Sequence, residues 1–109
     1  MAAILERTFQ AKLIKELKAL FEGCLVIKTD AGHRQGLPDL LVLFGNQWAA
    51  LEVKRSVTAG TQPNQHHYVK LMDGMSFSRF ICPENKEDVL RDLQQTFRSS
   101  GNARLSGSK

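Results

Sequence analysis

Asp39 directly precedes an apolar segment of the chain. Glu52 and Lys54 lie at the end of the next segment. The segments 40–44 and 47–54 are separated only by a Gly-Asn pair. Short apolar runs around Gly-Asn predict a β-hairpin with a two-residue turn, because these residues tolerate the positive φ that tight turns need. This turn also fixes which residues of the two strands face each other.

In this register Asp39 lies opposite Glu52, and Lys54 shares their face of the sheet. Opposed side chains have Cβ atoms about 5 Å apart, so two carboxylates there would repel each other. A divalent cation bound by carboxylate oxygens would neutralise the pair. Two other arrangements are compatible with the same register: the carboxyl groups share a proton, or one of them simply pairs with Lys54. A slip of one residue would remove the cluster.

The segment before the hairpin predicts an amphipathic helix over residues 3–22, followed by a strand over 24–29. Glu6 falls within the apolar stripe of that helix. A buried acid costs free energy unless it is paired or binds a metal. Alternatively, Glu6 is half solvated and complements the helix dipole near the helix start.

The second half of the chain predicts a helix from Pro63 to about Asp73, with Thr61 near its cap and Gly74 at its end. Gln65 should point inward, toward the sheet, where it needs hydrogen-bond partners. A strand over 76–82 and a helix from Pro83 to about Arg98 complete the order α-β-β-β-α-β-α. We therefore predict an α/β fold with about four strands flanked by helices.

Two loops carry basic residues that could contact phosphate. His33 and Arg34 lie in the loop 30–36, which leads directly into Asp39. Arg55 follows the hairpin and begins a loop rich in hydroxyl groups. Ordinary solvated loops explain both segments equally well.

The composition is that of one domain. The chain has 109 residues, 42% of them hydrophobic and 24% charged, with a net charge of +4. This mild basic excess agrees with a phosphate-bearing partner without demonstrating one. We expect residues 1–98 to form the domain and 99–109 a flexible tail. No run is long and apolar enough for a membrane span. No secretory signal is expected, and Cys24 and Cys82 read as free thiols of a cytoplasmic protein.

The hairpin motif resembles the PD-(D/E)xK nuclease superfamily, and within it the small virus-type replication-repair nuclease (VRR-NUC) domains. The resemblance covers roughly residues 4–82. It depends on an acid in the first helix, a Gly-x-Pro-Asp motif, a Glu-Val-Lys motif, and a Gln and a Gly in the next helix: Glu6, Gly36-Leu37-Pro38-Asp39, Glu52-Val53-Lys54, Gln65 and Gly74.

This resemblance implies a restriction-endonuclease-like core with a mixed sheet and a DNA endonuclease dependent on Mg²⁺ or Mn²⁺. It implies that the metal is held by three acids and one main-chain carbonyl: Glu6, Asp39, Glu52 and Val53. Lys54 would position the attacking water or neutralise the scissile phosphate, and Gln65 would orient Lys54 or a phosphate oxygen.

Stand-alone members of this family resemble Holliday-junction resolvases, are typically phage-encoded and tend to act as dimers. The resemblance thus implies a homodimer acting on branched or four-way-junction DNA in the cytoplasm of a bacterial host. A nuclease without junction preference, a restriction-type nuclease and a non-catalytic nucleic-acid-binding module are the alternatives. Retention of both opposed carboxylates argues against the last of these.

Overall fold

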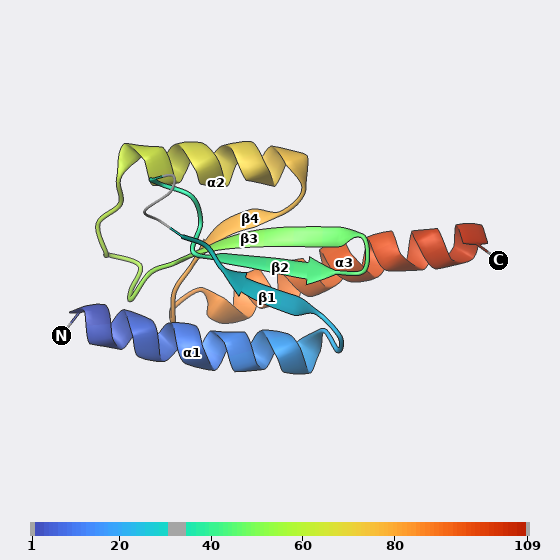
Figure 1. The fold of residues 1–109 in the computed structure, drawn as a ribbon, viewed down its shortest axis with the longest axis horizontal. Coiled ribbons are helices and arrows are strands. Elements are labelled where there is room, and N and C mark those ends of the chain that lie inside the picture. The colour runs from blue at the N-terminus through green and yellow to red at the C-terminus, as the bar shows by residue number, and fades with distance from the viewer. Residues whose placement is uncertain (1, 31–34, 109) are drawn as a thin grey trace.

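The computed structural model describes residues 2–30 and 35–108, and the side chains within 5–30 and 35–98. It is an α/β fold with the predicted element order (Figure 1). The elements are α1 (Ala2–Leu20), β1 (Leu25–Lys28), β2 (Leu40–Phe44), β3 (Gln47–Val53), α2 (Pro63–Met75), β4 (Ser78–Ile81) and α3 (Lys86–Ser108).

The four strands form one mixed sheet in the order β1-β2-β3-β4. The β1–β2 and β2–β3 pairs are antiparallel, and β3–β4 is parallel. The hairpin has the predicted register, since Phe44 pairs with Gln47 and Leu40 pairs with Leu51. Gly45 adopts a φ of 65°, and no described residue other than glycine has a positive φ. The turn therefore needs the conformational freedom of Gly45 only.

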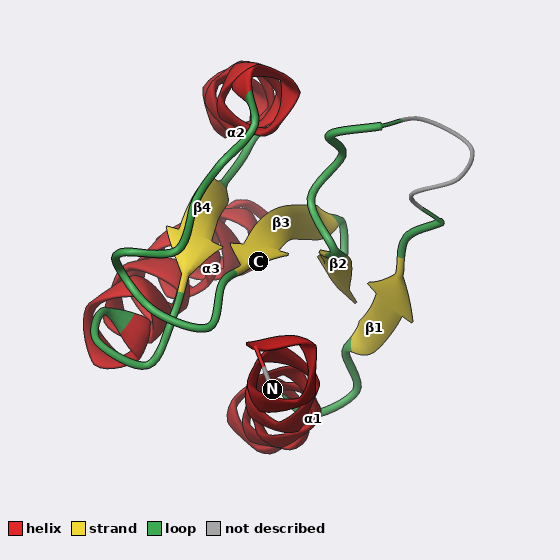
Figure 2. Ribbon diagram, turned by 90° about the vertical axis from the view of Figure 1, so that its left-hand side faces the viewer, coloured by secondary structure: helices red, strands yellow, loops and turns green. Residues whose placement is uncertain are grey.

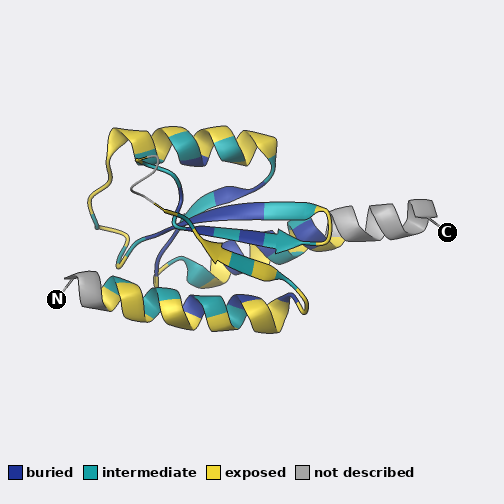
Figure 3. Cartoon of the chain, in the orientation of Figure 1, coloured by how far each residue is buried: buried dark blue, intermediate teal, exposed yellow. Residues whose placement is uncertain are grey.

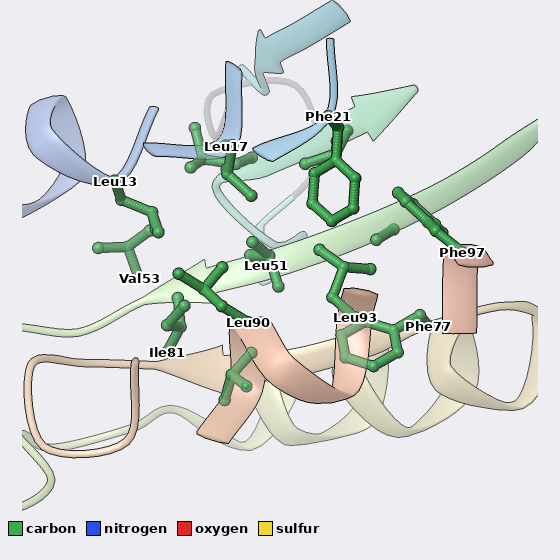
Figure 4. Packing of buried hydrophobic residues seen from close by; sticks show 14 residues of the cluster. Leu13, Leu17, Phe21, Leu51, Val53, Phe77, Ile81, Leu90, Leu93 and Phe97 are labelled. Carbon is green, nitrogen blue, oxygen red and sulfur yellow. The ribbon is translucent and has the colours of Figure 1, made fainter. Parts of the chain in front are cut away.

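The helices cover the two faces of the sheet unequally. Helices α1 and α3 pack on one face, and α2 packs on the other face over β3 and β4 (Figure 2). The buried residues gather between the sheet and the α1–α3 layer (Figures 3 and 4). Phe21, Phe44 and Phe97 form an aromatic cluster in this core, with ring centroids 5.1–5.7 Å apart. This core packs against the hairpin strands β2 and β3, which lie at the centre of the sheet.

Two helices run further than the sequence predicts. Gly74 does not end α2, which continues to Met75. A glycine inside a helix costs only about 1 kcal/mol relative to alanine, so it need not terminate one. The end is set instead by Ser76, whose N–H donates to the Met72 carbonyl at 2.9 Å and whose hydroxyl donates to the Trp48 carbonyl.

The last helix begins at Lys86 and extends to Ser108, past the predicted end near Arg98. It thus takes in most of the segment 99–109 that the composition indicated as a flexible tail. That segment contains no proline, and its two glycines, Gly101 and Gly107, are again too weak as breakers to end a helix. None of the described helices combines the length and the apolar character that crossing a membrane requires.

Candidate active site

The two acids of the hairpin meet at the end of the sheet where β3 finishes. The last paired residues are Leu40 and Leu51, and the next position along the same register sets Asp39 against Glu52. The Asp39 Oδ2 atom accepts a hydrogen bond from the Val53 N–H at 2.8 Å. Glu52 is only 2% exposed. The predicted pairing of these acids is therefore confirmed, and one of them is deeply buried.

Burial is the largest cause of an unusual pKa for Glu52. Desolvation, the negative charge of Asp39 and a hydrogen bond that protonated Glu52 makes with Asp39 raise its pKa to about 8; Lys54 opposes this shift and Glu6 adds to it. The Glu52 Oε1 atom is buried and has no hydrogen-bond partner among the described residues. Without a cation, the two carboxyl groups therefore keep a proton between them at neutral pH, which is one of the alternatives stated above.

Lys54 is held beside the acids by three groups. Its Nζ atom lies 3.9 Å from Glu52 Oε2, 2.9 Å from Gln65 Oε1 and 3.1 Å from the carbonyl oxygen of Gly60. Gln65 Nε2 also donates to Glu52 Oε2 at 3.0 Å. The inward direction predicted for Gln65 is confirmed, and its amide joins the acid to the ammonium group.

The first turn of α2 fixes this amide. Gln65 Oε1 accepts the N–H of Gln62, the N-cap residue, at 2.9 Å. Pro63 occupies the first helical position, as predicted. Thr61 lies next to the N-cap residue Gln62, near the cap as predicted, and its hydroxyl lies 2.6 Å from His66 Nε2. One side chain thus serves the helix start and the acidic cluster together.

Glu6 approaches the cluster from α1. It is half-buried, and its pKa is raised first by burial and then by the charge of Asp39, while Lys54 and Arg55 lower it. These electrostatic interactions show that Glu6 and the exposed Arg55 lie at the same end of the sheet as Asp39 and Lys54. Even so, the described residues contain no group of three or more His, Cys, Asp or Glu side chains close enough to hold a metal ion.

The main-chain carbonyl of Val53 is the fourth metal ligand that the resemblance implies. Val53 is the last residue of β3, two positions beyond the last pair of the hairpin, Leu40–Leu51. Its own N–H donates to Asp39 Oδ2, so Val53 lies directly beside the acidic pair.

Gly36 has a structural role that the motif alone did not reveal. Its φ is +91°, and a Cβ atom added there would lie 2.5 Å from Asn64 Cβ and 2.9 Å from the Asn64 carbonyl carbon. Only glycine lets the turn that leads to Asp39 pass so close to the first turn of α2. The sequence signal was the Gly-x-Pro-Asp spacing, but the partner could come only from the tertiary structure.

His33 and Arg34, predicted to contact DNA, lie outside the described residues. No protein-family model matches the chain, and no curated protein or solved structure matches it at a significant level. The family resemblance therefore depends on the motif residues and their arrangement.

Proposed function

We propose that this protein is a divalent-metal-dependent endonuclease that hydrolyses phosphodiester bonds in DNA. The observation that carries the proposal is the buried pairing of Asp39 and Glu52 beside Lys54, in which no N–H group of the described residues donates to Glu52 Oε1. A fold that needed only packing would be more stable with apolar residues there, because two buried acids side by side cost free energy.

The residues present fit a magnesium or manganese ion. Asp39, Glu52 and the Val53 carbonyl offer oxygen atoms, which are the ligands that these hard cations prefer. Mg²⁺ commonly binds through one or two carboxylates and completes its shell with water and substrate phosphate. Two carboxylates are thus sufficient, and Glu6 would act directly or through a water. A bound ion would supply neutralisation of phosphoryl charge and acidification of a water.

The remaining chemistry belongs to the chain itself. Gln65 and the Gly60 carbonyl hold Lys54 in place, so its ammonium group can orient the attacking water or offset the charge of the scissile phosphate. Arg55 is exposed at the same end of the sheet and is available to a neighbouring phosphate of the DNA backbone. The net charge of +4 favours approach of this polyanion.

The finer parts of the proposal come from the VRR-NUC resemblance. We propose that the substrate is branched or four-way-junction DNA, that the protein acts as a homodimer, and that it works in the cytoplasm of a bacterial host as a phage or prophage product. Symmetric cutting of a four-way junction needs two active sites, whereas one chain offers one.

A cleavage panel tests this function. Single-stranded, duplex, flap and four-way-junction DNA are each incubated with Mg²⁺, Mn²⁺ or a chelator. The proposal expects metal-dependent cleavage that Asp39→Asn and Lys54→Ala abolish while both variants stay folded. Equal cutting of all substrates would indicate a non-selective or restriction-type nuclease. DNA binding without cleavage under any condition would indicate a non-catalytic binding module and contradict the proposal.

A further inference from the structure

A hollow of about 500 Å³ lies between the turn that leads into β2 and the first turn of α2. The two turns are in close contact there, where Gly36 passes Asn64. The volume of the hollow is in the range of sites that bind small molecules. Six residues line it, and we call it the amide pocket: Gln35, Gly36, Gln62, Pro63, Asn64 and Gln65.

The amide pocket shares one of its walls with the candidate active site. Gln65 lines the pocket, and its Oε1 atom accepts a hydrogen bond from Lys54 Nζ at 2.9 Å. Its Nε2 atom donates to Glu52 Oε2 at 3.0 Å. On the other wall, Gly36 precedes Asp39 by only three residues. The pocket therefore lies directly beside the paired acids and the ammonium group.

The lining of the pocket is polar, and none of its six residues carries a charge. Gln35 and Asn64 are exposed, so their side-chain amides are open to a ligand. Each amide offers a carbonyl acceptor and two N–H donors. Such a lining suits a neutral ligand with donors and acceptors side by side, in preference to a phosphate, a carboxylate or a cation.

The start of α2 does not make this pocket an anion site. Helix N-termini bind anions through N–H groups that have no other partner. Here the Gln62 N–H donates to Gln65 Oε1, and the Gln65 N–H donates to the Gln62 carbonyl. Pro63 has no N–H. The side-chain amides therefore dominate what the pocket can recognise.

We propose that the amide pocket receives an unpaired nucleobase of the DNA substrate, next to the phosphate that Lys54 contacts. The proposal rests on the function proposed above, because DNA bound at Lys54 brings the base to the pocket. Unpaired bases present hydrogen-bond donors and acceptors on their Watson–Crick edges, which proteins read directly. In a duplex these edges are already hydrogen-bonded to the opposite strand, so only an unpaired base can use the pocket.

This form of recognition selects the structure of the DNA and not its sequence. Rotating a side-chain amide by half a turn exchanges its donor and acceptor, so the same side chain can serve different bases. A fully paired duplex leaves the pocket empty, whereas a flap or a single strand supplies unpaired nucleotides. The pocket therefore favours substrates with unpaired nucleotides close to the scissile phosphate.

Binding of single-stranded DNA in chelator tests the pocket, because the proposed nuclease does not cut without metal. A fluorescent strand of thymidines is compared with an abasic strand of the same length, which has the same phosphates and no bases. Fluorescence anisotropy should show that the wild type binds the thymidine strand about tenfold more tightly. Replacing both exposed amides, Gln35→Ala with Asn64→Ala, should abolish this preference. Alanine keeps the Cβ atom that lies beside Gly36, so circular dichroism should show an unchanged fold.

Two controls separate base recognition from other effects. Gln95→Ala removes an exposed amide of α3, outside the pocket, and should bind both strands as the wild type does. Arg55→Ala removes a cation proposed to contact phosphate, and should weaken binding of both strands by the same factor. If the double variant fails to fold, Gln35→Ala alone is used and should reduce the preference for the thymidine strand.

Equal affinity of the wild type for the two strands, no binding of the thymidine strand, or a preference that the folded pocket variant retains would overturn the proposal. Cleavage with Mn²⁺ is measured separately on the same proteins. Base-dependent binding by a protein that cuts no DNA would support the pocket and contradict the nuclease. Metal-dependent cleavage with equal affinity for both strands would do the reverse.

Discussion

Gln65 Nε2 donates a hydrogen bond across 3.0 Å to Glu52 Oε2, which ties the first turn of α2 to the buried acid of β3. The other end of the same amide accepts from Lys54 Nζ and from the N–H of Gln62. One neutral side chain therefore orients a carboxylate and an ammonium group and also caps a helix.

Replacing this amide should impair both activity and stability. In Gln65→Ala, Lys54 and Glu52 lose the group that orients them, and we expect metal-dependent DNA cleavage to fall roughly 10- to 100-fold, as for other partners of metal-site ligands. Loss of the cap should lower the free energy of unfolding by about 1 kcal/mol. Gln95→Ala, at an exposed glutamine of α3, is the control. Unchanged cleavage in Gln65→Ala would show that Gln65 does not position Lys54 or Glu52.

The close approach of Gly36 to Asn64 predicts a larger cost for an added methyl group there than at another glycine of similar conformation. Gly23 has a φ of +86° with nothing within 4 Å of an added Cβ, whereas Gly36 has a φ of +91° and meets Asn64. Gly23→Ala should cost only backbone strain, about 1–2 kcal/mol. Gly36→Ala should cost about 1–3 kcal/mol more because of overpacking. Urea unfolding of both variants measures the difference. Equal losses of unfolding free energy would contradict the steric contact between an added Cβ at Gly36 and Asn64.

The raised pKa of Glu52 predicts a pH-dependent stability of the metal-free protein. The folded pKa is about 8 and the ordinary value is 4.5, so the folded state retains a proton that the unfolded chain releases between these values. The stability from this proton is complete below pH 4.5 and is lost as pH rises through 8. Urea unfolding in chelator should show the wild type losing stability relative to Glu52→Gln over this window. Parallel pH profiles for the two proteins would refute the assignment.

The same proton should compete with a bound cation. Because a ligating carboxylate must be deprotonated, binding of Mn²⁺ should displace the proton of Glu52. The apparent affinity should then fall about tenfold for each pH unit below the folded pKa. Calorimetry at pH 6, 7 and 9 measures this slope and the accompanying proton release. An affinity independent of pH would show that Glu52 is not a ligand.

The hairpin was predictable because its constraint is local. Gly45 fixes a two-residue turn, the turn fixes the register, and the register sets Asp39 against Glu52. Gln65 was predictable for a similar reason, since a proline marks the start of its helix and helical periodicity turns it inward. Both inferences needed only backbone geometry and spacing.

Other features depend on contacts between distant segments, and the sequence could not reveal them. Gly74 predicts the end of α2, but the helix continues past it. The helix ends at the hydrogen bonds of Ser76, one of which goes to Trp48. Gly36 is required by Asn64, which is 28 positions away. Ile27 of β1 is exposed because α2 packs over β3 and β4. Periodicity cannot say which half of a sheet a helix will cover.

The most direct test of the central claim is a calorimetric titration of the chelator-treated protein with Mn²⁺ at pH 8. The account predicts a saturable binding event in the wild type that Asp39→Asn abolishes, while the fold survives because the asparagine oxygen can still accept the Val53 N–H. Asp73→Asn, at an exposed acid of α2, should bind as the wild type does. No saturable binding by the wild type, or equal binding by Asp39→Asn, would show that the paired acids are not a metal site.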